Sequence, residues 1–330
     1  MSGIEQIEVA PDEAGSRTDR WFKRRYPGLG HGALEKLLRT GQVRIDGKRV
    51  KASHRLEAGS VIRVPPLDEG AKTSVKPAKS PPVKVDPKDV ALLARNILHK
   101  DDWVIALNKP PGLAVQGGSG TSRHVDALLD TLRFGSKERP RLVHRLDKDT
   151  SGVLLIARTA EAARRLTASF RHKDARKVYW ALVVGVPRPG QGRIDAPLGK
   201  EGGAGEERMT VTDDGKRAVT YYKVIEPFGK RAAWVALMPV TGRTHQLRAH
   251  AVAMGHPVVG DGKYGGKEAF LDGRVSKKLH LHARSIEMPH PAGGTLSVSA
   301  PLTSHMAEAW KLFGLDPEDD GDPFEELELD

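Results

Sequence analysis

Two short segments of the chain concentrate side chains that could do chemistry. The first, HRLDKDTSG, places His144, Asp147 and Asp149 in a polar stretch between two apolar runs. Catalytic groups are often found on such loops, because the flanking strands hold them rigidly. A carboxylate in this position could act as a nucleophile or as an acid–base group. Ordinary turn formation explains the same segment equally well, since Asp, Thr and Ser hydrogen-bond readily to nearby backbone.

The second segment, TGRTHQLRAH, places Arg243, His245, Arg248 and His250 at the start of a helix predicted over residues 244–254. The apolar residues of this helix recur at helical spacing, while His245 and Arg248 lie three residues apart on another face. Two arginines and two histidines near a helix start form an electropositive spot. Such a spot suits a carboxylate or a phosphate as its partner.

The elements around these segments predict an α+β fold. Short apolar runs predict strands at residues 103–107, 142–143, 153–157, 178–186, 219–225 and 232–238, and helical periodicity predicts a further helix at residues 160–172. The NKPPG segment at residues 108–112 predicts a loop. Because helices do not alternate regularly with the strands, we expect a mixed, largely antiparallel sheet.

Composition divides the chain into five parts. Residues 65–87 combine Pro, Lys and Ser with almost nothing to bury, so they predict an extended linker. Before the linker, residues 17–64 predict a compact unit with two helices, and residues 1–16 an N-terminal extension. After it, residues 88–315 are long enough for one catalytic domain. Residues 316–330 predict a mobile acidic tail.

Charge indicates the class of partner. The formal net charge is +11, but the last 15 residues hold nine Asp or Glu and no Lys or Arg, so the other 315 residues carry +20. A body that basic is expected to bind a polyanion, and nucleic acid is the first candidate. A generic solvated basic surface is the alternative interpretation.

Other compositional features exclude several classes of protein. The chain has no Cys, which excludes a disulfide scaffold, an Fe–S cluster and a Cys nucleophile. It has no apolar run near the roughly 20 residues of a membrane helix and no signal-peptide pattern. We therefore expect a cytoplasmic protein that does not bind a membrane. Nothing in the sequence requires a partner chain, which predicts a monomer.

The unit at residues 17–64 resembles the S4 RNA-binding module, a small α/β fold with two helices. The residues that carry the resemblance are LEKLLRTGQVRIDGKRVKASHRLEAGSVIRV, residues 34–64. The resemblance implies binding to structured RNA, mainly through backbone contacts and shape. The basic residues in this unit are candidates for that contact: Lys36, Arg39, Arg44, Lys48, Arg49 and Lys51.

Five spaced motifs between residues 88 and 302 resemble the RluA/RluC/RluD family of RNA pseudouridine synthases. HRLDKDTSGVLL is similar to the aspartate motif of the family and RKVYWALV to its tyrosine motif, and VTGRTHQLRAH, GHPVVGDGKYG and LHLHA follow in order. With the S4-like unit in front, the chain is most similar to the RluC-type enzymes, which modify large-subunit (23S) ribosomal RNA. The resemblance implies a catalytic domain of the pseudouridine synthase type, acting on free 23S rRNA or on an assembling large subunit.

The resemblance also implies an isomerisation that needs no metal and no other cofactor: the C1′–N1 bond of uridine breaks, the base turns, and C1′ joins C5. By the resemblance, Asp147 is the carboxylate beside the sugar–base bond, Arg248 pairs with it, and Tyr179 stacks on the target base. Whether the carboxylate adds to the sugar, adds to the base or removes a sugar proton stays open. Arg145 is expected to fill the space that the extruded base vacates or to hold phosphate, and Arg243 to hold phosphate.

Three other classes of protein fit parts of the sequence. A serine hydrolase would use Ser151, His144 and Asp147, but the segment lacks a GxSxG elbow. A non-catalytic RNA-binding ribosome assembly factor is the main alternative, and RNA binding without turnover would identify it. A zinc hydrolase would need a ligand spacing such as HExxH, which is absent. Its ligands would come from the C-terminal histidines His245, His250, His256, His280 and His282.

Overall fold

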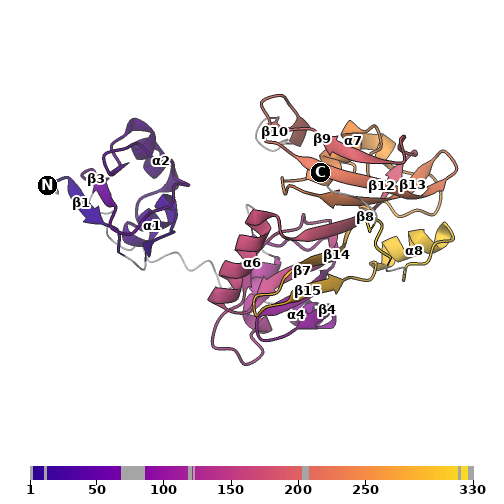
Figure 1. Ribbon diagram of the computed structural model, residues 1–330, viewed down its shortest axis with the longest axis horizontal. Coiled ribbons are helices and arrows are strands. Elements are labelled where there is room, and N and C mark those ends of the chain that lie inside the picture. Colours follow the sequence, from indigo (N-terminus) through magenta and orange to yellow (C-terminus); the bar gives the residue numbers. More distant parts are fainter. Residues whose placement is uncertain are drawn as a thin grey trace. The chain divides into compact units, whose positions relative to one another are not determined.

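The computed structural model of the chain consists of two compact units, Met1–Val83 and Lys84–Asp330 (Figure 1). It describes residues 3–10, 13–67, 86–117, 121, 123–202, 208–318 and 321–325. Most of the predicted linker therefore lies outside the described residues, as do residues 319–320 and 326–330 of the predicted tail.

The N-terminal unit packs two helices against a three-stranded antiparallel sheet of order β1-β3-β2. Its core is an apolar cluster that includes Trp21, Phe22, Leu34 and Ile62. A two-residue turn follows β2, and in it Asp46 and Gly47 both have positive φ. The elements are β1 (Glu5–Glu8), α1 (Thr18–Arg25), α2 (His31–Thr40), β2 (Arg44–Ile45) and β3 (Val61–Val64).

The first residues of the chain belong to this unit. Residues 5–8, assigned from the sequence to an N-terminal extension, form β1 and pair with β3 along its length. Val9, directly after β1, is 1% exposed in the apolar cluster. The side chains of β1 alternate in burial, but a segment of four residues with two glutamates is too short and too charged for its sequence to predict a strand.

The C-terminal unit is built on one mixed sheet, ten-stranded within the described residues, of order β4-β5-β7-β14-β8-β13-β12-β9 with β15 beside β14 and β6 beside β7. Only β7 and β14 pair in parallel; the other neighbours are antiparallel. This confirms the predicted α+β class and largely antiparallel sheet. The strands are β4 (Ile97–Lys100), β5 (Val104–Lys109), β6 (Arg141–Leu142), β7 (Ser151–Ala157), β8 (Arg176–Val184), β9 (Gln191–Asp195), β12 (Val219–Phe228), β13 (Ala232–Pro239), β14 (Leu281–Pro289) and β15 (Thr295–Ser299).

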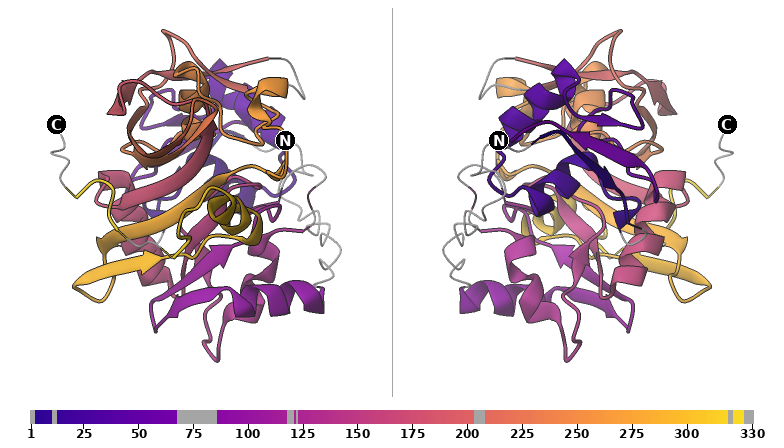
Figure 2. Two further views of the ribbon diagram at one scale, coloured as in Figure 1. Left: turned by 90° about the vertical axis from the view of Figure 1, so that its right-hand side faces the viewer. Right: turned by 90° about the vertical axis from the view of Figure 1, so that its left-hand side faces the viewer.

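Helices cover both faces of this sheet. Residues of α8 enter the cluster around Trp180 and residues of α7 the cluster around Ala181, on opposite faces of β8, while residues of α6 and residues of α4 and α5 enter two further clusters. In the left view of Figure 2 the dark-yellow helix α8 lies over the sheet, where Trp310 stacks at 6.1 Å on Trp180 of β8. The helices and the hairpin outside the main sheet are α4 (Pro87–Arg95), α5 (Val125–Leu128), α6 (Ala160–His172), α7 (Gln246–Ala253), α8 (Ser304–Leu312), β10 (Leu198–Glu201) and β11 (Arg208–Val211).

Two segments differ from the sequence predictions. Asn108 and Lys109, predicted in a loop, are the last residues of β5 and pair with β7, and Lys109 is fully buried. The segment predicted as a mobile tail is partly packed, because Phe324 is 4% exposed in the cluster around Trp310 and Asp322 pairs with Arg176 at 2.7 Å. In the part of the chain that the structure describes, no helix is long and apolar enough to span a membrane.

Candidate active site

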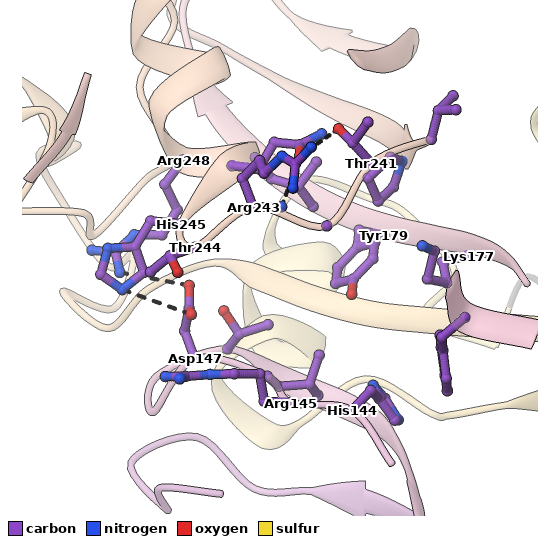
Figure 3. A pocket seen from close by; sticks show the side chains of 18 of the residues that line it. His144, Arg145, Asp147, Lys177, Tyr179, Thr241, Arg243, Thr244, His245 and Arg248 are labelled. Carbon is purple, nitrogen blue, oxygen red and sulfur yellow. Dashed lines mark hydrogen bonds and ion pairs between the residues drawn. The ribbon is translucent and has the colours of Figure 1, made fainter. Parts of the chain in front are cut away.

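One pocket of the C-terminal unit brings the two chemistry-bearing motifs together. It has a volume of about 550 Å³ and is lined by the loop between β6 and β7, the end of α6, strand β8 and the start of α7 (Figure 3). The lining includes all five residues that the sequence assigned to a site in this domain: Asp147, Tyr179, Arg248, Arg145 and Arg243. Segments far apart in the chain therefore meet in one cavity.

Buried groups on the core side of the loop that carries Asp147 hold this loop in place. Leu146, the preceding residue, is 5% exposed and packs into the apolar cluster beneath the loop. The Lys109 ammonium donates to the Lys148 carbonyl and to two carbonyls of the loop after β5, each at 2.9 Å. The backbone N–H of Gly112 donates to the same Lys148 carbonyl at 2.9 Å. Burial lowers the pKa of Lys109 to about 7 against the attraction of nearby carboxylates.

A glycine allows this loop to enter the centre of the sheet. Gly152 has φ +106°, and a Cβ at this position would overlap the backbone of Ala283 in β14. The close approach permits the parallel pairing of β7 with β14 at Ser151 and Gly152. The loop residue Asp147 is thereby held beside β14 and its other neighbour, β8.

Arg248 lies in the first turn of α7 and forms a buried ion pair. Its Nε and Nη2 groups donate to the two carboxylate oxygens of Asp261 at 2.7 and 2.6 Å, and Asp261 is 2% exposed. The remaining Nη1 faces Asp147 Oδ2 at 4.0 Å. Burial acts to lower the pKa of Arg248, but the two carboxylates outweigh it and raise that pKa. Sequence reasoning paired Arg248 with Asp147 alone and did not identify Asp261, which is the closer partner.

His245 faces the other oxygen of Asp147. The sequence placed it on the α7 helix, whereas it is the residue before the helix and has φ +51°. Its Nε2 lies 3.7 Å from Asp147 Oδ1 (Figure 3). Its Nδ1 lies 2.8 Å from the hydroxyl of Tyr264. Burial lowers the pKa of His245 more than Asp147 raises it, which favours the neutral imidazole.

The sharp turn before α7 is held by Gln246, whose side chain is 4% exposed. Its Oε1 accepts from the Thr241 hydroxyl at 2.7 Å and from the Arg243 backbone N–H at 3.0 Å. Its Nε2 donates to the Val219 carbonyl of β12 at 2.9 Å. This satisfied buried network fixes the start of α7, and with it Arg248, against the sheet.

Tyr179 and Lys177 lie on the same face of β8, because side chains two residues apart in a strand point the same way. Figure 3 shows Asp147, Tyr179 and Lys177 in succession along the pocket. Burial, and then the Asp147 carboxylate, raise the pKa of the Tyr179 hydroxyl, while burial lowers the pKa of Lys177. Neither side chain has a hydrogen-bond or ion-pair partner among the described residues, so both are open to a ligand.

Arg145 and Arg243 line the same pocket and are exposed. The Arg145 guanidinium has no hydrogen bond or ion pair within the ranges that the structure describes. Arg243 donates from Nε to the Arg217 carbonyl at 3.1 Å and leaves its two Nη groups open. The pocket thus combines one central carboxylate with a strongly basic lining.

The structure does not assemble the serine-hydrolase site. The Ser151 hydroxyl lies 2.8 Å from His282 Nδ1, and both residues are fully buried. His144 accepts a hydrogen bond from the Leu155 backbone N–H at 2.8 Å and stacks on Phe170. Neither the serine nor this histidine is placed to act with Asp147.

The histidines proposed for a zinc site occupy separate environments. His250 contacts the Thr220 hydroxyl at 2.9 Å, and His256 contacts the Val184 carbonyl at 2.8 Å. His280 contacts the Lys278 carbonyl, and His282 contacts the Ala300 carbonyl. No group of three potential ligands that could hold a metal occurs among the described residues.

The six basic side chains of the N-terminal unit that are candidates for RNA contact differ in whether they bind other groups of the protein. Arg44 donates to the Gly41 and Gly47 carbonyls, both at 3.1 Å, and so holds the turns on either side of β2. The other five side chains are exposed: Lys36, Arg39, Lys48, Arg49 and Lys51. These five are available to a ligand, and Arg44 has a structural role in addition.

We expect acid to destabilise the C-terminal unit steeply through its buried histidines. Burial lowers the pKa values of His144 and His282 to about 3 and that of His280 to about 4, all below the ordinary 6.5. As pH falls below about 6.5, the unfolded chain binds protons that the folded chain does not. The free energy of unfolding should therefore fall, by up to about 4 kcal/mol per pH unit for three such groups.

Urea titrations at pH 7, 6 and 5 measure this slope. The double variant Ser151→Ala/His282→Leu removes one buried imidazole together with its hydroxyl partner. Its slope should be smaller than that of the wild type by about 1.4 kcal/mol per pH unit. An unchanged slope in the variant would contradict the assignment.

Comparison of this chain with the sequences and structures of known proteins identifies its protein class. Residues 103–253 match the profile of the family described as RNA pseudouridylate synthase. Relatives that are 38–40% identical over more than 90% of the chain carry the name ribosomal large subunit pseudouridine synthase C. The chain therefore belongs to the RNA pseudouridine synthase family, in its RluC-type branch, and is an enzyme that isomerises uridine in RNA. The resemblance seen in the motifs is thereby confirmed, and the enzyme is favoured over a non-catalytic binding protein.

Curated relatives match nearly the whole chain. Ribosomal large subunit pseudouridine synthase C of Vibrio cholerae is 38% identical over 309 residues, which cover 93% of this chain and 96% of the relative. The protein of the same name from Yersinia pestis is 40% identical over 92% of this chain and 93% of the relative. That from Escherichia coli is 38% identical over 91% of this chain and 93% of the relative.

Solved structures of this family are similar to about two thirds of the chain. Human RNA pseudouridylate synthase domain containing 4 is similar with a TM-score of 0.58 and 29% identity, covering 69% of this chain and 97% of that one. Human RNA pseudouridylate synthase domain containing 1 gives a TM-score of 0.52 and 26% identity, covering 68% of this chain and 96% of that one. The sheet described above is therefore the fold of this family.

Proposed function

We propose that this enzyme converts specific uridines of large-subunit (23S) ribosomal RNA to pseudouridine, with Asp147 as its catalytic carboxylate. The observation that carries the proposal is the pocket in which Asp147 faces two N–H donors, His245 Nε2 at 3.7 Å and Arg248 Nη1 at 4.0 Å. The substrate class is supported by relatives named as large-subunit enzymes that match over more than 90% of this chain.

Asp147 is the group that assists breakage of the C1′–N1 bond. An anionic carboxylate beside C1′ stabilises the oxocarbenium character that develops as this bond lengthens. Arg248 places a fixed positive charge beside this carboxylate as the base displaces water from the pocket. Because Arg248 is anchored by Asp261, it serves this purpose without closing on Asp147 and blocking its oxygens.

Tyr179 is the residue on which the target base stacks. Its ring is the aromatic surface of the pocket next to Asp147, and its hydroxyl is free to meet the base. The base must leave its own stack to reach this position, at a cost of a few kcal/mol. The open cations Lys177 and Arg243 are placed to hold phosphates of the extruded nucleotide.

The N-terminal unit, residues 17–64 with β1, is proposed to be an S4-type RNA-binding domain joined to the catalytic domain by the linker at residues 65–87. Its five exposed basic side chains would hold structured RNA through backbone contacts. We propose further that the enzyme acts as a monomer in the cytoplasm, on free rRNA or on an assembling large subunit.

Arg145 is expected to matter more for folded than for unstructured RNA. If it fills the space that the extruded base vacates, Arg145→Ala should lower turnover of a structured rRNA fragment by about tenfold more than turnover of a short unstructured strand. Rates on both substrates, measured at saturating enzyme, test this. Equal losses on the two substrates would show that Arg145 does not replace the base.

The exposed basic residues of the N-terminal unit should set the salt dependence of binding. Replacing Lys36 and Arg39 of α2 by alanine should reduce the slope of log affinity against log salt by about 2, one for each phosphate that is no longer neutralised. Replacing two exposed basic residues of another surface, Arg164 and Lys311, provides the control. Equal changes in the two double variants would show that α2 has no particular part in RNA binding.

Mapping of pseudouridines in ribosomal RNA tests the substrate. A strain without this protein should lose pseudouridine at defined positions of 23S rRNA and at none of small-subunit rRNA. Complementation by the wild type, but not by Asp147→Ala, should restore them. Intact modification of 23S rRNA in the deletion strain would direct the search to another RNA.

A further inference from the structure

The Asp147 carboxylate faces two donors, and the mechanism above uses only one of them. Arg248 Nη1 approaches Oδ2 at 4.0 Å, and His245 Nε2 approaches Oδ1 at 3.7 Å (Figure 3). Both distances exceed a hydrogen bond. The position of His245 is costly to maintain, because its backbone has φ +51°. The protein thus holds an imidazole beside the reactive carboxylate in a conformation that few residues adopt.

The hydrogen bonds of Tyr264 favour one tautomer of this imidazole. The Tyr264 hydroxyl accepts a hydrogen bond from the Met209 backbone N–H of β11 at 3.1 Å, so its own O–H is free to donate. His245 Nδ1 lies 2.8 Å from that hydroxyl, and no other acceptor for it occurs among the described residues. When the hydroxyl donates to Nδ1, the proton of the neutral imidazole is on Nε2 and points at Asp147. The opposite tautomer would turn a lone pair toward the carboxylate and leave the Tyr264 proton without an acceptor.

Tyr264 is itself fixed by the ion pair that anchors Arg248. Its backbone N–H donates to Asp261 Oδ1 at 3.2 Å, and the Arg248 guanidinium lies 4.8 Å from the centre of its ring. Its ring meets that of His245 edge to face at 5.5 Å. The two donors that face Asp147 are therefore held in one connected unit.

We propose that His245 is a positioning residue that orients Asp147 through its Nε2–H, and that Tyr264 acts through His245 by fixing its tautomer. The inference rests on the catalytic role proposed for Asp147. When the base enters the pocket and water leaves, the N–H groups of His245 and Arg248 are the donors that remain for the carboxylate. With one donor at each oxygen, the carboxylate plane is fixed, and the lone pairs not facing these donors are left for the sugar.

Four variants separate this role from a structural one. His245→Asn suits a backbone with positive φ but is too short to reach Asp147, whereas His245→Gln carries an N–H donor that needs no tautomer. Tyr264→Phe removes only the hydroxyl. The fourth is the double variant Tyr264→Phe/His245→Gln. Tyr222→Phe is the matched control, because Tyr222 donates to the Pro189 carbonyl outside the pocket.

The measurement is the single-turnover rate of tritium release from RNA labelled at uridine C5, together with RNA affinity and the midpoint of thermal unfolding. Tyr264→Phe and His245→Asn should each lower the rate by about tenfold, the effect of one hydrogen bond to a charged group. His245→Gln should stay within about threefold of the wild type, and Tyr264→Phe should have no further effect in that background. RNA affinity should be unchanged throughout.

The result that would overturn the inference is a Tyr264→Phe variant that turns over at the wild-type rate, or one whose loss persists undiminished in the His245→Gln background. A loss confined to RNA affinity would overturn it as well. Failure of the wild type and Tyr222→Phe to release tritium would instead contradict the proposed function, so the two failures are distinguishable.

Discussion

Replacement of Asp147 by asparagine is expected to abolish isomerisation while leaving RNA binding intact. The amide has nearly the shape of the carboxylate but carries no negative charge and is a poor nucleophile and base. Losing the central group of a catalytic unit lowers the rate by about 10⁴-fold or more. RNA affinity should change little, because phosphate contacts come from basic side chains elsewhere in the protein. Single-turnover tritium release and filter binding measure the two quantities.

A matched carboxylate outside the pocket serves as the control for this variant. Asp174, between α6 and β8, is exposed and lies outside the pocket lining. Asp174→Asn makes the same chemical change and should keep the wild-type rate. Residual activity of Asp147→Asn above about one hundredth of the wild type would contradict the proposed role of Asp147.

Replacement of Arg248 by methionine is expected to have the largest combined effect on stability and activity. It leaves Asp261, which is 2% exposed, as a buried carboxylate without its cation. Removing one partner of a buried ion pair costs about 3–5 kcal/mol of the free energy of unfolding. The rate should fall as well, because Asp147 loses the cation that faces its Oδ2 at 4.0 Å. Urea unfolding and single-turnover kinetics measure the two losses.

A second variant separates the two effects. Arg248→Met/Asp261→Asn removes both charges, and the asparagine retains an acceptor for the Tyr264 backbone N–H. Most of the lost stability should return, while the rate should stay low. If activity returned together with stability, Arg248 would act only through the fold and not on Asp147.

Much of the catalytic domain could be predicted because its strands are strongly apolar. The helix at residues 160–172 was predicted with its observed bounds, and β7, β8, β12 and β13 were predicted within a few residues of theirs. The short strands β9, β10 and β11 were not predicted, because their exposed faces carry charge and they lack a clear alternation. Strand β14 was missed although the last three residues of LHLHA begin it, because the buried His280 and His282 interrupt the apolar run around its start.

The motifs predicted which residues form the candidate site, but they did not predict which other residues contact them. All five predicted residues line one pocket, since the motifs follow the ends of elements that meet at the centre of the sheet. The partners of these residues could not be predicted, because each comes from a distant segment. Asp261 and Tyr264 lie in GHPVVGDGKYG, one of the motifs that carry the family resemblance, which did not indicate that this segment contacts Arg248 and His245.

The burial of Lys109 in a strand is another feature that the local sequence did not predict. Pro110 and Pro111 suggested that the segment before them is a loop, whereas tertiary pairing with β7 extends β5 to Lys109. A lysine is rarely fully buried, and the carbonyl acceptors that make this burial tolerable come from two loops. Local sequence does not show those acceptors.

The most direct test of the account is tritium release from 23S ribosomal RNA labelled at uridine C5, with the wild-type protein and Asp147→Ala side by side. We expect release by the wild type, in a fixed small number of equivalents per RNA, and none by the variant, with equal RNA affinity. Tight binding of 23S RNA by both proteins without release by either would contradict it.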